Sequence, residues 1–465
     1  MTLLLAPILQ RFAEQFPIPT MARAVLERCL NPRQLDAWFE TVAGAQYTRS
    51  LLFSTLFQLM LQVVSRQQPS IHAAYQAAPV PITVSVKSVY NKLNGLEPGT
   101  SAALVRYSAE QATALIAAVG GARPGWLAGY RVKILDGNAL AGREHRLAET
   151  RDQAAAPLPG KALVVFDPAL DVIIDLVPSA DAYTQERALL PAVLERVQPG
   201  ELWIADRNFC TRGWLWGLHA RGAVGLVRAR AQMPFAPLEA LRVVGEIESG
   251  RVSEQRGLID APDGSGTLAV RRIRLDLHQP TRDGDDTLYL LTTVPAEAAD
   301  ACALARLYRE RWTLEKAFLH LTLQLRCEID PLAYPPAALF GLAMAVVAYN
   351  GLAVVKATLR QVHGAAAIDD GVSGYYLVHE MARVTESLET LVEPRDWAVF
   401  QTLTPATMAV WLIATAGRVQ LRKYRKHPRG PKKPPVKRTH DPRRPHVSVA
   451  RLLAQRQSAK EAATP

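Results

Sequence analysis

Cysteine is scarce in this chain, and its spacing is not that of a ligand set. The 465 residues contain four cysteines, and no two of them form a C-x-x-C pair. This spacing argues against a zinc site or a disulfide framework and fits a reducing compartment. The N-terminal stretch MTLLLAPILQRFAEQF lacks the basic start and the long apolar run of a signal peptide. The sequence therefore predicts a cytoplasmic chain that is not exported.

Long hydrophobic runs are also lacking, with one exception. Residues 337–355 form a nineteen-residue stretch in which Asn350 is the only polar side chain. That length is close to what crosses a bilayer. The run is rich in Ala and Gly, contains an Asn-Gly pair and stands alone in the chain, which favours a buried core helix over a membrane span.

Acidic residues are almost absent from one short segment. Residues 422–444 carry eleven Lys or Arg and a single acid, Asp441, so the remaining chain has 43 basic and 42 acidic residues. Ten of the eleven net positive charges therefore lie in this segment, between prolines. Such a composition predicts an extended, solvated tail. A solubilising role or a membrane surface are alternatives, but a compact block of charge favours a polyanion such as nucleic acid.

The whole chain is 49% hydrophobic and 21% charged, which is typical of a globular protein, and its length predicts about three domains. Helical patterns fill the first part of the chain, and a Ser-led start near Ser85 is compatible with a helix-turn-helix or a plain helical hairpin. Strand patterns begin at Tyr130 and alternate with short helices, which predicts an α/β fold with a mixed sheet. A β-rich stretch then precedes a return to helix at Asp300.

These changes of texture divide the chain into six predicted segments. They are a helical N-terminal domain with a possible DNA-binding role (1–125), the first part of an α/β core (126–231), a β-rich insertion (232–297), the second part of the core (298–365), a C-terminal helical region (366–418), and a basic, flexible tail (419–465).

Two aspartates close predicted strands. Asp136 ends the strand YRVKILD, and Asp206 ends the strand ELWIAD. Ligands of α/β sheets gather at the carboxyl ends of strands, so both side chains are expected at one edge. Aspartate also caps turns and helices, which is the simpler explanation for each residue taken alone.

A third acid lies in the segment LYRERWTLEKAF. If residues 307–325 form one helix, Tyr308, Arg311 and Glu315 share a stripe at the border of the apolar face. A carboxylate at such a border needs a partner, and pairing with Arg311 is the simpler explanation. Three separated carboxylates at a sheet edge are also what two Mg²⁺ ions would need for phosphodiester chemistry.

At this point the sequence resembles a known family, the DDE transposases of bacterial insertion sequences of the insertion-sequence-four type. That family has Tyr, Arg, Glu and Lys at the spacing Y-(2)-R-(3)-E-(6)-K, and Tyr308, Arg311 and Glu315 match it. The segments ILDGNALAGREHRL, LPGKALVVFDPAL and ELWIADRNFCT, and the tail with HVSVARLLAQR, are similar to family segments in the same order. The likeness runs from about residue 84 to 455.

The resemblance implies a ribonuclease H-like core interrupted by the β-rich insertion. It implies Asp136, Asp206 and Glu315 as catalytic and metal-binding residues for Mg²⁺, with Mn²⁺ as a substitute, and Tyr308 and Arg311 as DNA contacts. It further implies double-stranded DNA as partner, both element ends and target, a homodimer on paired ends, a location at the nucleoid and no membrane. The tail residues expected to contact DNA are Lys423, Arg425, Lys426, Arg429, Lys432, Lys433, Lys437 and Arg438.

The chain departs from the family in two places. Thr322 stands where the family has Lys, so Thr322→Lys is expected to strengthen phosphate binding if no other cation supplies that charge. The insertion holds only two aromatics between Pro234 and Pro295, namely Phe235 and Tyr289, for a base to stack on. Two alternatives therefore stay open: a catalytically impaired or repurposed DNA-binding protein, and a related two-metal nuclease.

Overall fold

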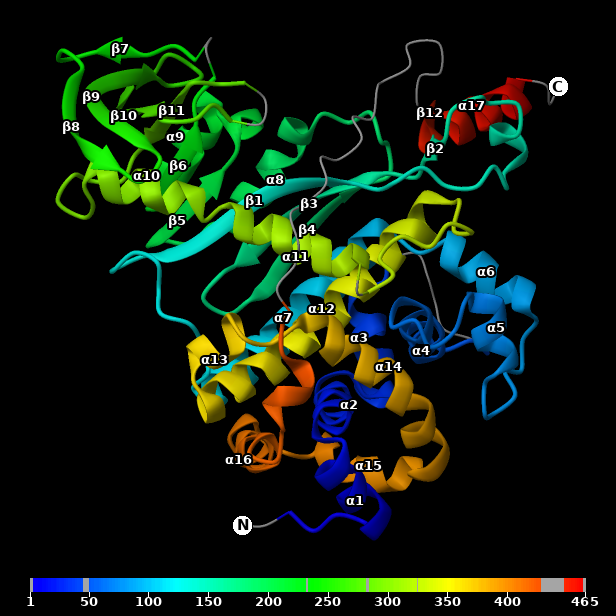
Figure 1. The fold of residues 1–465 in the computed structure, drawn as a ribbon. Coiled ribbons are helices and arrows are strands. Elements are labelled where there is room, and N and C mark those ends of the chain that lie inside the picture. The colour runs from blue at the N-terminus through cyan, green and yellow to red at the C-terminus, as the bar shows by residue number, and fades with distance from the viewer. Residues whose placement is uncertain are drawn as a thin grey trace.

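The computed structural model describes residues 3–44, 50–230, 233–281, 284–323, 325–427 and 447–462, without the side chains of 316, 319, 320, 322 and 323. Its described residues form one ten-stranded mixed sheet, a small two-stranded sheet and a large body of helices (Figure 1). The mixed α/β class expected from the sequence is present.

Five strands make the first half of the large sheet, in the order β4-β3-β1-β5-β6. Their bounds are Arg131–Ala139 (β1), Lys161–Asp167 (β3), Val172–Ser179 (β4), Glu201–Ala205 (β5) and Val224–Arg228 (β6). The first three run antiparallel to one another, whereas β1, β5 and β6 are parallel neighbours. This arrangement is consistent with a ribonuclease H-like fold.

Both faces of these five strands are covered, because apolar side chains point alternately to one face and to the other. On β3, Val164 and Phe166 pack into the core shared with the helical body, and Leu163 and Val165 pack into a second core on the other face. The helices α8 (Leu190–Leu194) and α9 (Arg212–His219) contribute to that second core. Ahead of α8, residues Glu186–Leu189 form a 3-10 turn, η2.

The β-rich stretch continues the same sheet. Its strands are Ala236–Pro237 (β7), Arg242–Ile247 (β8), Gly250–Asp260 (β9), Thr267–Leu277 (β10) and Thr287–Thr292 (β11). The last of them, β11, pairs antiparallel with β6, and the order then runs β11-β10-β9. The strand candidates read from the sequence are present, but they extend the core sheet sideways instead of forming a separate one (Figure 1).

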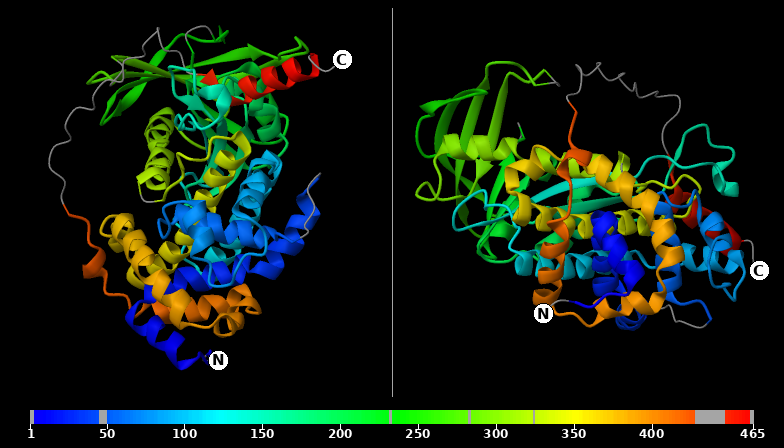
Figure 2. Two further views of the ribbon diagram at one scale, coloured as in Figure 1. Left: turned by 90° about the vertical axis from the view of Figure 1, so that its right-hand side faces the viewer. Right: turned by 60° about the horizontal axis from the view of Figure 1, so that its bottom comes forward.

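The helices of the two ends of the chain form one body. Those before the sheet are Pro7–Gln15 (α1), Pro17–Leu30 (α2), Pro32–Val42 (α3), Phe53–Val64 (α4), Ile71–Gln76 (α5), Val86–Asn94 (α6) and Pro98–Val119 (α7). Those after it are Pro335–His363 (α12), Ala365–Asp369 (α13), Gly374–Leu391 (α14), Pro394–Gln401 (α15) and Pro405–Ala416 (α16). Many begin with proline, whose fixed φ suits the first helical position. Figures 1 and 2 show the two sets intermixed, with α2 against α14 and α15.

The segment after Ser85, for which a helix-turn-helix was one prediction, does not present an exposed recognition helix. Ser85 does cap α6, since its side chain accepts a hydrogen bond from the Ser88 amide. The following helix, α7, packs against β4 and α12 and buries Leu104, Val105 and Leu115. Because α7 lies in the core, it is not available as an exposed recognition helix.

The apolar run of residues 337–355 lies within α12, which is long and apolar enough to cross a membrane by composition alone. In this structure 89% of its most apolar window is buried, and α7 is the main neighbour of the helix. Asn350, the polar residue of the 337–355 run, has hydrogen-bond partners, because its side chain bonds to both backbone groups of Ile173 and to Ser108. The helix therefore serves as the core helix that the sequence predicted.

The single helix expected over residues 307–325 is broken. Helix α10 spans Ala301–Arg309 and helix α11 begins at Trp312 and ends at Leu323. Between them the amides of Glu310 and Arg311 bond three residues back, which is the tighter 3-10 pattern. The prediction of one continuous helix over residues 307–325, and the stripe of side chains derived from it, is therefore wrong beyond Glu310.

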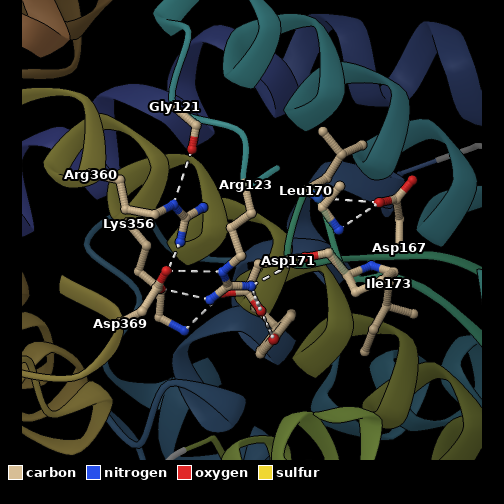
Figure 3. A network of polar contacts seen from close by, with 12 residues as sticks. Gly121, Arg123, Asp167, Leu170, Asp171, Ile173, Lys356, Arg360 and Asp369 are labelled. Atoms are coloured by element: carbon tan, nitrogen blue, oxygen red, sulfur yellow. Dashed lines mark hydrogen bonds and ion pairs between the residues drawn. The ribbon is translucent and has the colours of Figure 1, made fainter. Parts of the chain in front are cut away.

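A buried ionic network fastens the turn between β3 and β4 to the helical body (Figure 3). Asp171, at the turn, forms ion pairs with Arg123 at 3.4 Å and Lys356 at 3.3 Å, and it accepts a hydrogen bond from the Tyr349 hydroxyl at 2.8 Å. Arg123 also pairs with Asp369 at 2.7 Å. The network joins the end of α7, helix α12 and helix α13 to the sheet.

The C-terminal segment packs beside the connection between β1 and β3, where it completes the small two-stranded sheet. A 3-10 turn, η4, spans Leu421–Tyr424, and the chain is described again from Val447–Ser448 (β12) and Val449–Ala462 (α17). Strand β12 pairs in parallel with β2 (Pro157–Leu158), and α17 lies beside η1 (Ala148–Thr150). The flexible tail expected over residues 419–465 is thus folded at both of its described ends, because Tyr424 and Val449 are both buried.

Candidate active site

Asp136 and Asp206 lie on neighbouring strands. The parallel pairing of β1 with β5 ends at Leu135 and Ala205, and the two aspartates are the residues that follow. Strand β1 continues past Asp136 through its antiparallel pairing with β3, so Asp136 does not close the strand as predicted. The parallel register nevertheless places both carboxylates at one edge of the sheet.

Asp206 is held by a local turn. It caps the 3-10 turn η3 (Arg207–Phe209), and its Oδ1 accepts a hydrogen bond from the Asn208 amide at 2.7 Å. Aspartate suits this position because its short side chain satisfies an amide that the turn leaves free. The capping role expected for Asp206 and the position at the sheet edge are therefore compatible.

Arg311 joins the two distant parts of the site. Its Nη1 lies 2.9 Å from Asp136 Oδ2, and its Nη2 lies 3.2 Å from Glu315 Oε1. The simple pairing of Arg311 with Glu315 is therefore present, but the same guanidinium also reaches across to the sheet. The break between α10 and α11 brings Arg311 to this position at the start of α11.

The ionisation of Asp136 reflects the crowding. Burial raises the pKa of Asp136 to about 6; Arg311 acts against that rise, and the charges of Asp206 and Glu315 add to it. Burial also raises the pKa of Tyr308 to about 12, with Asp206 adding to the rise. Burial lowers the pKa of Arg311, but Tyr308 and the three carboxylates outweigh it, so the net shift is upward. All five predicted residues outside the tail therefore share one electrostatic neighbourhood.

The fit to a divalent cation can be tested on the donor set. Three carboxylates offer the oxygen ligands that Mg²⁺ prefers, and their mutual repulsion is what a cation would relieve. Within the described part of the chain, no three His, Cys, Asp or Glu side chains are arranged to hold a metal ion. The guanidinium of Arg311 lies between Asp136 and Glu315, so a cation bound by both would have to displace it. The residue types therefore suit a divalent cation, but the three carboxylates would have to come closer together and Arg311 would have to move aside to bind one.

A pocket of about 760 Å³ opens beside Asp206. Its lining includes four arginines, Arg207, Arg228, Arg230 and Arg272, together with both aromatics of the insertion. The Arg272 guanidinium lies 4.1 Å from the ring centre of Phe235 and 5.8 Å from that of Tyr289. The pairing of β11 with β6 brings these residues to Asp206.

Sequence reasoning missed the arginines of this pocket. The signal was present in the segments GLVRAR and VRRIRLDL, where arginines follow or alternate with apolar strand positions. Their convergence depends on the order of β6, β11 and β10 in the sheet, which local patterns do not contain.

Glu186 is a further acid that sequence reasoning missed. Its Oε2 accepts a hydrogen bond from Asn208 Nδ2 at 2.5 Å, and its carboxylate lies against Gly137, the neighbour of Asp136. Nothing in the sequence around Glu186 marked it as a candidate site residue.

The predicted tail contacts divide into two groups. Lys423 and Arg425 are exposed near the buried Tyr424, and Lys426 Nζ donates to the Asp369 carbonyl at 2.5 Å. Arg429, Lys432, Lys433, Lys437 and Arg438 lie outside the described residues. The side chain of Thr322 is outside them too, so its replacement of the family Lys stays a sequence-based expectation.

Comparison with known proteins connects this geometry to a family. Residues 128–350 match the model of a family described as the transposase DDE domain, a range that runs from just before β1 into α12. The match supports a DDE transposase. No curated protein matches the sequence.

Among solved structures, the chain is similar to one in the cryo-EM structure of a piggyBac transposase synaptic complex with hairpin DNA. The two chains share 11% sequence identity and a TM-score of 0.41, over 84% of this chain and 85% of that one. A likeness of this size carries no argument about the site.

Proposed function

We propose that this protein is a DNA transposase that binds the ends of its own insertion sequence, cuts them and joins the freed ends to target DNA. The observation that carries the proposal is that Arg311 pairs with both Asp136 and Glu315, with Asp206 following the strand next to that of Asp136, within the segment that matches a transposase DDE domain. The insertion-sequence-four type and a bacterial element rest on sequence alone, namely the Tyr308, Arg311 and Glu315 spacing and the further segments that resemble the family in the same order.

Asp136, Asp206 and Glu315 are the residues that would hold Mg²⁺ or Mn²⁺ in this proposal. Cations held there would supply activation of a nucleophile and stabilisation of the leaving oxygen of a phosphodiester. The chain's own groups do the remaining work: Arg311 offsets the negative charge of Asp136 and Glu315, and its guanidinium is the group that would contact a DNA phosphate. Tyr308, buried beside it, fixes the junction of α10 and α11.

The arginine pocket supports a DNA partner. Guanidinium groups bind phosphate oxygens in pairs, and an aromatic ring offers a face for a base. The pocket adjoins Asp206, so a strand bound there would run past the proposed catalytic carboxylates. The basic residues of the tail add salt-dependent affinity in the proposal, a homodimer assembles on the paired ends, and the protein works at the nucleoid of the cytoplasm.

The deciding experiment incubates purified protein with end-labelled DNA that carries the sequences flanking its coding region, in Mg²⁺ or in EDTA. Cleavage at the element ends in Mg²⁺ alone, followed by joining to a second DNA, is the expected result. A nuclease would release ends without joining them, and a repurposed DNA-binding protein would shift the DNA without cutting it.

Substitution of the acids tests the assignment of the site. Asp136→Asn, Asp206→Asn and Glu315→Gln should each reduce cleavage by about a thousandfold or more while DNA binding changes little, because each removes a metal ligand and leaves the phosphate-binding cations in place. Asp152→Asn, an exposed acid in the same part of the chain, is the control. A Glu315→Gln protein that cuts at the wild-type rate would remove Glu315 from the site.

A further inference from the structure

Glu186 lies at the start of η2, in the crossover that leads from β4 to β5. Its half-buried carboxylate lies between Gly137, which follows Asp136 in β1, and Asn208, in the turn that Asp206 caps. One side of the carboxylate lies against Gly137 and the other accepts the hydrogen bond from Asn208. No chemistry proposed above uses this acid.

Gly137 makes the close approach possible. A Cβ built on this residue would lie 2.1 Å from Glu186 Oε1, well inside any permitted contact. The backbone of Gly137 is not in the left-handed region, so the glycine is not required by a turn. Its lack of a side chain has one evident structural consequence here, which is room for the carboxylate of Glu186 next to Asp136.

Asn208 transmits the position of Glu186 to Asp206. The Asn208 amide donates to Glu186 through Nδ2 and accepts from Arg230 Nη2 through Oδ1 at 3.2 Å, which fixes the orientation of the amide. The backbone amide of the same residue donates to Asp206 Oδ1. Arg230 also donates to the Arg207 carbonyl at 2.9 Å, so the whole η3 turn is held from both sides.

We propose that Glu186 is a positioning residue for Asp136 and Asp206: through Gly137 and Asn208 it fixes the spacing between the part of β1 that carries Asp136 and the turn of Asp206. The inference rests on the proposed function, since the spacing matters because the two carboxylates act together. Glu186 acts through its neighbours and touches no reacting atom.

The first test compares two replacements of Glu186. Glu186→Ala removes the hydrogen bond to Asn208, and displacement of a catalytic group by about 1 Å costs on the order of a hundredfold in rate. Single-turnover cleavage at saturating DNA should therefore fall by about tenfold to a hundredfold while the Kd for DNA stays unchanged. Glu186→Gln keeps an oxygen that accepts from Asn208, so it should restore the rate to within about threefold of wild type. Glu195→Ala, an exposed acid in the same crossover, is the matched control.

The second test leaves every charged residue in place. Gly137→Ala should push the Glu186 carboxylate aside and reproduce the loss of rate seen in Glu186→Ala. Gly213→Ala is its control, because a Cβ there would meet only Pro262 Cγ at 3.9 Å.

Hydrogen exchange separates this inference from the proposed function. The Asn208 amide should exchange at least about tenfold faster in Glu186→Ala and in Gly137→Ala than in wild type, Glu186→Gln or Gly213→Ala. That measurement needs no DNA and no metal, so it holds whether or not the protein cuts DNA. Unchanged exchange in both variants, or a Glu186→Gln protein as slow in cleavage as Glu186→Ala, would overturn the positioning role.

Discussion

At the scale of single residues, Arg311 and Asp136 define the resting state of the proposed site. Asp136 is 20% exposed and Arg311 11% exposed, so their ion pair is largely removed from water. Even with this partner, burial and the two other acids keep the pKa of Asp136 at about 6. The site therefore holds a carboxylate that is strained when it is ionised, as expected where function and stability oppose each other.

The raised pKa of Asp136 predicts that Asp136→Asn stabilises the fold. An Asp with a folded pKa of about 6 and an unfolded pKa of about 3.9 contributes stability below pH 4 that is lost as the pH rises through 6. Asn resembles the protonated form, so in EDTA at pH 7.5 the variant should gain about 1–3 kcal/mol in unfolding free energy. Urea unfolding at several pH values measures this.

The gain of Asp136→Asn should disappear at pH 4, where Asp136 is protonated in the folded protein as well. Asp152→Asn, an exposed replacement, should show no gain at either pH. A variant that is less stable than wild type at pH 7.5 would mean that the Arg311 pair outweighs the burial of Asp136.

At the scale of elements, the structure depends on a few fixed junctions. The sheet grows from β6 into β11, the α10–α11 break delivers Arg311, and the ionic network of Asp171 fastens the β3–β4 turn to α12 and α13 (Figure 3). Asp171 has a φ of 61°, a conformation that Asn also tolerates. It is 5% exposed and faces two cations, Arg123 and Lys356.

Asp171→Asn should destabilise the junction between the sheet and the helical body. Burial tends to raise the pKa of Asp171, but Lys356, Arg123 and the Tyr349 hydroxyl together lower it to about 2. The resulting stability, about 2–3 kcal/mol, is present above about pH 4 and is lost as the pH falls through 2. The unfolding free energy at pH 7 should fall by that amount in the variant, and Asp370→Asn, at an exposed position, should leave it unchanged. Equal stability of Asp171→Asn and wild type at pH 7 would contradict the prediction.

At the scale of the whole molecule, the C-terminal segment packs onto the folded body. Ser448 Oγ and Arg451 Nε contact the carboxylate of Asp181 at 2.7 and 2.8 Å, and Val449 is buried with Leu147 and Ala333. The basic segment is thus attached at η4 on one side and at β12 on the other. A cut after Val419 would remove buried Tyr424 and the docked helix α17 as well as charge.

Charge removal without truncation is therefore the sharper test of the basic segment. Replacing Arg429, Lys432, Lys433, Lys437 and Arg438 with Gln should reduce the slope of log affinity against log salt by up to about 4.5, at roughly 0.9 for each DNA phosphate that is no longer neutralised. Titrations of DNA binding between about 50 and 200 mM salt measure the slope. Thermal unfolding should be unchanged, since none of the anchoring residues is altered. If the slope does not change, the segment has a solubilising role and not a DNA-binding one.

The local sequence sufficed for much of the element assignment. The strands ending near Asp136 and Asp206, the strands of the insertion and the core helix α12 were predictable, because alternation and apolar runs are local properties. The Tyr308, Arg311 and Glu315 spacing likewise pointed to one group of side chains, and the structure brings them together. The continuous helix drawn through Arg311 was wrong, because a tightened turn leaves no mark on apolar periodicity.

By itself the sequence determined which segments are strand or helix and where the positive charge is concentrated, since both follow from residues a few positions apart. Only the tertiary structure decided that Arg311 reaches an acid 175 residues away, that Glu186 fits against Gly137, and that arginines of β6 and β10 surround one pocket. These contacts depend on strand order and on the packing of distant segments. The physical reason is that a short-range pattern fixes the face a side chain occupies, whereas the partner on that face is set by the whole fold.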